Sequence, residues 1–103
     1  MIHELRIYTY LPLKQTAVVE QMKQLMPLFE KYEIKVVGVW TTLIGRREHF
    51  VYLLEWESLA DREKKWTKFL KDPDLQKAFD DFGPVTQYHD YSILVPTEYS
   101  PMR

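Results

Sequence analysis

Cysteine is absent from this chain of 103 residues, and glycine occurs only three times. Without a thiol the protein forms no disulfides, and cysteine nucleophiles and thiolate-bound zinc or iron–sulfur clusters are excluded. No apolar run approaches the roughly 20 residues that a membrane-spanning helix needs. The opening segment MIHELRIYTY carries charges between its apolar side chains, unlike a secretory signal peptide. We therefore predict a cytoplasmic protein.

An excess of charge of either sign is also lacking. The 14 basic and 15 acidic residues nearly cancel, giving a net charge of −1. Binding to nucleic acid or to an anionic membrane surface needs a basic patch, so neither partner is predicted. Signature motifs for phosphate binding, dinucleotide binding, serine hydrolysis and paired-carboxylate catalysis are missing as well. The sequence thus names no reaction, and whether the protein is an enzyme stays open.

The three histidines are too scattered to suggest a metal site. His3, His49 and His89 fall near the ends of predicted strands, and no H-x-H or H-x-x-x-H spacing occurs. We predict no metal and no tightly held cofactor. His89 with Asp90 is the best pairing for acid–base chemistry, although a histidine at a strand end is more commonly just solvated.

Aromatic side chains are what the sequence has in plenty. They make up 15% of the residues, including three tryptophans and seven tyrosines. So many large rings favour a ring-rich core, a packed interface or a pocket for a flat ligand. The length is enough for one domain with one core. We predict a single domain over residues 1–103, with an irregular tail at 96–103.

Hydrophobic periodicity predicts alternating strands and helices along the chain. The strands are expected at 2–11, 34–44, 49–56 and 86–95, and the helices at 14–32, 58–70 and 72–82. The last two helical segments are separated by Asp72-Pro73, a helix-start signal. The resulting βαββαβ order predicts an α+β, ferredoxin-like fold. Its four-stranded antiparallel sheet has the order 4-1-3-2, with the helices on one face.

The two faces of this sheet are both apolar. We expect the helices to cover the aliphatic face, which carries Leu5, Ile7, Val51 and Leu53. The other face then carries mostly large rings: Tyr8, Tyr10, Trp40, Phe50, Tyr52, Leu54 and Trp56. Left bare, it would exceed the apolar area that a monomer tolerates. We expect a second copy to cover it, which gives a twofold homodimer.

Four segments of the chain resemble the NIPSNAP family. They are ELRIY at 4–8, LFEKY at 28–32, GVWTTLIG at 38–45 and EWESLADR at 55–62. The resemblance spans nearly the whole chain and implies a dimeric α/β barrel of the ferredoxin-like superfamily. Relatives often carry a histidine where this chain has Tyr52, and a glycine where it has Glu33. Histidine chemistry of the relatives is therefore not carried over.

Similar dimeric barrels include small cofactor-free monooxygenases, isomerases and haem-binding proteins. The main hypothesis is a homodimer that binds a small hydrophobic or aromatic molecule beside the sheet, as a monooxygenase or isomerase. The alternatives are a non-enzymatic dimerisation module and, third, a haem-binding protein. Fold alone does not decide between them.

The candidate ligand-binding residues combine rings with a few polar groups. They are Arg6, Tyr8, Trp40, Thr42, Tyr52 and Trp56. Arg6 could orient an anionic or carbonyl-bearing ligand through its planar guanidinium, or it could form an ion pair with Glu4. The rings could line an apolar pocket, or they could pack as a dimer core.

Overall fold

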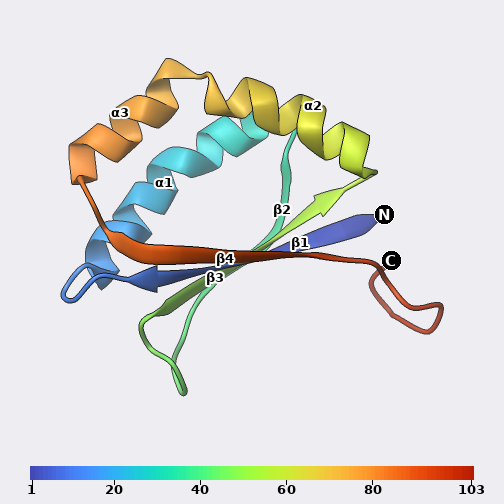
Figure 1. Cartoon of the computed structure of the whole chain (residues 1–103), viewed down its shortest axis with the longest axis horizontal. Helices are drawn as coiled ribbons and strands as arrows, with labels where there is room; N and C mark the ends of the chain where they lie inside the picture. Colours follow the sequence, from blue (N-terminus) through green and yellow to red (C-terminus); the bar gives the residue numbers. More distant parts are fainter.

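The computed structural model describes residues 1–103, which form four strands and three helices (Figure 1). In chain order they are β1 (Ile2–Tyr10), α1 (Gln15–Lys31), β2 (Lys35–Thr41), β3 (His49–Trp56), α2 (Leu59–Leu70), α3 (Pro73–Phe82) and β4 (Thr86–Leu94). The strands form one antiparallel sheet in the order β2-β3-β1-β4, and all three helices lie on one side of it. The predicted ferredoxin-like α+β fold is confirmed. None of the helices combines the length and the apolar character needed to cross a bilayer.

The helix starts follow local signals in the sequence. The Ser58 hydroxyl accepts a hydrogen bond of 3.1 Å from the backbone N–H of Asp61, which caps α2. The Asp72 carboxylate accepts one of 2.8 Å from the backbone N–H of Asp74, and Pro73 opens α3. These two caps fix where the helices begin.

Helix α1 ends in a turn that usually needs glycine. Glu33 has a φ of 58°, in the left-handed region. The backbone N–H of Ile34 donates to the carbonyl of Phe29 at 2.8 Å, and that of Glu33 to Glu30 at 3.0 Å. This is the Schellman pattern, and Phe29 and Ile34 are both buried, as its hydrophobic contact requires. Packing of Phe29 and Ile34 holds the turn despite the glutamate.

The helices cover the ring-bearing face of the sheet, so the expectation that they cover Leu5, Ile7, Val51 and Leu53 is wrong. The alternate residues of β3 that face the helices are almost fully buried: Phe50 (3% exposed), Tyr52 (1%), Leu54 (0%) and Trp56 (1%). Rings bury more apolar area than aliphatic side chains, so covering this face gains more free energy. Period-two alternation separates two faces but does not say which one points inward.

The aliphatic face is the open one. Leu5, Ile7, Val51 and Leu53 are half-buried there. Trp40 lies on the same side and is 51% exposed, with its ring so close to Gly38 that a Cβ at that position would collide with it. No helix covers this side of the sheet (Figure 1). The molecule therefore presents an apolar surface opposite its core.

Candidate functional site

A cavity of about 550 Å³ lies between the sheet and the helices. Its walls are mainly apolar, with Phe29 of α1, Phe69 of α2 and Phe79 of α3 on the helical side. The strands contribute polar groups, among them Arg6 and Tyr8. An apolar enclosure of this size with a few convergent polar groups is typical of small-molecule sites.

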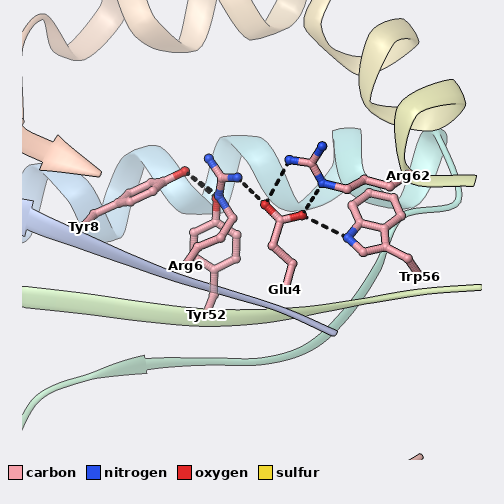
Figure 2. Close-up of polar contacts among 6 residues, drawn as sticks. All are labelled: Glu4, Arg6, Tyr8, Tyr52, Trp56 and Arg62. Carbon is pink, nitrogen blue, oxygen red and sulfur yellow. Dashed lines mark hydrogen bonds and ion pairs between the residues drawn. The ribbon is translucent and has the colours of Figure 1, made fainter. Parts of the chain in front are cut away.

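The polar groups are organised around the buried carboxylate of Glu4 (Figure 2). Oε1 of Glu4 accepts hydrogen bonds from Nε1 of Trp56 at 3.0 Å and from Nε of Arg62 at 2.6 Å. Oε2 accepts from Nη2 of Arg62 at 3.2 Å and from Nη1 of Arg6 at 2.5 Å. Burial raises the pKa of Glu4, but the hydrogen bonds from Arg62 and Arg6 outweigh it and hold that pKa below its usual value. Glu4 is therefore a carboxylate with every lone pair engaged.

Arg6 reaches from β1 into the cavity and is only 6% exposed. Its guanidinium carbon lies 4.8 Å from the ring centroid of Trp66 and 4.9 Å from that of Tyr91. Burial disfavours its charge, but Tyr52, Tyr8 and Glu4 more than offset this and raise the pKa of Arg6. Arg6 is thus a permanent cation held by rings.

Two tyrosine hydroxyls meet beside Arg6. The hydroxyls of Tyr8 and Tyr52 are 2.5 Å apart, and Nε of Arg6 donates to the Tyr8 oxygen at 3.2 Å. Burial, followed by the neighbouring Tyr8, raises the pKa of Tyr52 well above its usual value. Tyr52 therefore keeps its proton, and the pair can donate a hydrogen bond to a ligand oxygen.

His89 of β4 lines the same cavity. Its ring stacks on Tyr8 with centroids 4.0 Å apart, and its Nε2 lies 2.8 Å from the hydroxyl of Thr86. Burial and then the charge of Arg6 lower the pKa of His89, so the neutral imidazole can accept a proton. The expected pairing with Asp90 does not form, because Asp90 pairs with Ile7 in the sheet and lies on the open face.

The structure brings together only part of the predicted site. Arg6, Tyr8 and Tyr52 converge on the cavity. Trp56 is buried beside them and fixes Glu4 without lining the cavity. Trp40 lies on the open face of the sheet, and the Thr42 hydroxyl donates to the carbonyl of His49 at 3.0 Å.

Sequence patterns alone missed the contribution of α2. Arg62 holds Glu4 with two hydrogen bonds, and Trp66 stands against Arg6. The available signal was their four-residue spacing, which places both side chains on one face of a helix. A buried charge pair in β1 also requires a partner from the covering helix. Once Glu4 and Arg6 are assigned to the covered face, Arg62 follows as the partner.

Comparison with known proteins identifies relatives across the whole chain. The NIPSNAP family model matches residues 3–101. A NIPSNAP family protein from Agrobacterium tumefaciens superimposes with a TM-score of 0.90 at 23% identity, covering 99% of this chain and 98% of the other. A NIPSNAP-like domain protein from Burkholderia xenovorans gives 0.86 at 24% identity, covering 97% and 88%.

A more distant structure shares the fold. An antibiotic biosynthesis monooxygenase superimposes with a TM-score of 0.64 at 11% identity, covering 94% of this chain and 99% of the other. At such identity the likeness concerns the fold alone. Among curated proteins no match to this chain was found.

Proposed function

Because the chain belongs to the NIPSNAP family, and this membership names no reaction, we propose a function from the cavity: the protein binds a small hydrophobic or aromatic molecule between its sheet and helices. The observation that carries the proposal is the apolar enclosure of about 550 Å³ with Arg6 and Tyr8 on its floor. Structural side chains alone would fill such a space, since protein interiors are close-packed.

The polar groups of the cavity fit proton abstraction next to a carbonyl. His89 can accept the proton, and the hydroxyls of Tyr8 and Tyr52 with Arg6 can stabilise the oxygen on which negative charge develops. Such a step begins an isomerisation, and it also begins an oxygenation that needs no tightly held cofactor. The proposal is therefore an isomerase or a cofactor-independent monooxygenase.

The open face favours a second candidate, a homodimer that pairs through the sheet. Leu5, Ile7, Trp40, Val51 and Leu53 form a continuous apolar set there, which we call the open-face patch. Pairing of two such patches would give the face-to-face arrangement of a dimeric barrel. The earlier expectation used the ring-bearing face for this contact, which the helices occupy. A protein acting only as a dimerisation module would need this patch and no occupied cavity.

Thermal denaturation with a panel of neutral and anionic aromatic compounds, such as indole, naphthamide and naphthoate, tests the main proposal. A compound that binds the native state raises the melting temperature, and the stabilisation grows with the logarithm of its concentration above Kd. Leu70→Trp narrows the cavity at an exposed position and is expected to remove the shift. Leu59→Trp is the matched control, since Leu59 is exposed on the same helix but does not line the cavity. A panel without any shift would overturn the cavity function and leave the dimerisation module.

A further inference from the structure

We propose that the molecule bound in this cavity carries one negative charge on an otherwise apolar or aromatic body, and that Arg6 binds this charge. The inference rests on the proposed function and specifies the class of ligand: an aromatic or aliphatic carboxylate, or the enolate or phenolate form of a carbonyl or phenol. It is carried by the charge balance, the free donors of Arg6 and the composition of the cavity wall.

The charges of this cluster do not cancel. Arg6 and Arg62 are both cations, and Glu4 is the single carboxylate that pairs with them. No aspartate or glutamate lines the cavity, so Arg6 is the one permanently charged group on its wall. A buried cation that is only half neutralised is unfavourable, and an anion placed beside it removes that cost.

Glu4 has partners other than Arg6. Arg62 already binds both of its oxygens, and Trp56 donates a further hydrogen bond. An ion pair serving only the fold would be complete with these partners. Arg6 is therefore a second cation on this carboxylate, and its hydrogen bond from Nη1 occupies the last acceptor site of Glu4.

Arg6 keeps donors free for a ligand. Of the five N–H groups of a guanidinium, Nε uses one on Tyr8 and Nη1 uses one on Glu4. Nη2 donates to no group of the chain, and in Figure 2 it points away from the strands toward the helices. Since the guanidinium also lies against the rings of Trp66 and Tyr91, these donors are already oriented before a ligand arrives.

Binding of matched probes tests the inference. Naphthoate and naphthamide share one aromatic body, but only naphthoate is charged. Charge-assisted hydrogen bonds favour the anion, so calorimetry is expected to give naphthoate about tenfold tighter binding or more. Equal binding of the two probes would overturn the inference while leaving the proposed function intact. Binding of neither would overturn both.

Variants assign the preference to Arg6. Arg6→Gln is expected to abolish the discrimination while naphthamide still binds. Arg46→Gln removes the same charge from the exposed β2–β3 hairpin and is expected to change nothing. Discrimination that survives in Arg6→Gln would overturn the assignment.

A measurement on the unaltered protein covers the case in which Arg6→Gln does not fold. The absorbance of para-nitrophenol distinguishes its neutral and anionic forms. An apolar cavity without a cation would raise the pKa of the bound phenol, whereas Arg6 lowers it. We expect a lowered pKa for the bound probe. A raised pKa would overturn the inference.

Discussion

The two faces of the sheet differ in the opposite sense to the usual rule that charged side chains face solvent and apolar side chains face the core. The covered face carries the charged residues Glu4 and Arg6, which meet Arg62 of α2, together with the largest rings. The open face is aliphatic and carries Trp40 in solvent. Buried charges cost free energy that an apolar core would not, so the charges under the helices indicate a functional site. An exposed apolar surface indicates a contact with another molecule, which a single chain does not make.

Substitutions at two neighbouring residues of β3 give the strongest test of this difference between the faces. Leu54 is fully buried under the helices, and Leu53 is half-buried on the open face. Leu54→Asp is expected to lose more than about 4 kcal/mol of unfolding free energy, since it combines a lost side chain with an unpaired charge. Leu53→Asp should fold and weaken self-association. Urea denaturation and sedimentation measure the two effects, and equal destabilisation would contradict the assignment of faces.

Glu4→Gln tests the charged cluster of Glu4, Arg6 and Arg62 and should cause the second largest loss of stability. The change leaves the buried Arg6 and the partly buried Arg62 without a carboxylate, and breaking a buried pair costs about 3–5 kcal/mol. Chemical denaturation measures the loss. The control is Glu20→Gln, which removes an exposed partner of Lys23 and should cost less than about 0.5 kcal/mol. A loss for Glu4→Gln no larger than the control would mean that the cluster is not held by charge.

Acid should weaken the junction between α1 and α3. Asp72 accepts hydrogen bonds from Lys31 Nζ at 2.8 Å and Tyr32 at 2.5 Å, and these, Lys31 first, lower its pKa to about 2. A pKa below the unfolded value means that the stabilisation is complete above about pH 4 and is lost as the pH falls toward 2. Stability measured across this range should fall less steeply in Asp72→Asn. An unchanged slope in that variant would exclude Asp72 as the cause.

The smallest effect is expected at the end of α1, away from both faces. Glu33→Gly relieves the left-handed conformation and should stabilise the protein by about 0.5–1 kcal/mol. Glu30→Gly, inside the helix, should instead destabilise by about 1 kcal/mol. The melting temperatures of the two variants should therefore move in opposite directions.

The fold could be predicted because its signals are local. The Ser58 and Asp72 caps and the alternation in β1 and β3 each follow from neighbouring residues, and right-handed crossovers order the sheet. The structure moves the remaining boundaries only slightly, for example to Lys35–Thr41 in β2.

The site could be predicted only in part, because it depends on which face is covered. Arg6, Tyr8 and Tyr52 lie on the same face of the sheet, and the alternation of side chains along β1 and β3 predicted this. Trp40 was predicted on the ring-bearing face, but it pairs with Val51 and lies on the open face. Arg62 comes from a helix more than fifty residues along the chain from Glu4, a contact that no local pattern contains.

The three tryptophans of this protein occupy three different surroundings, and each can report on one of them. Trp56 is sealed in the core, Trp66 lines the cavity and Trp40 stands in solvent on the open face. Their intrinsic fluorescence therefore contains separate signals for unfolding, ligand binding and self-association. Single-tryptophan versions would let a spectrometer follow each process in the same solution without any added label.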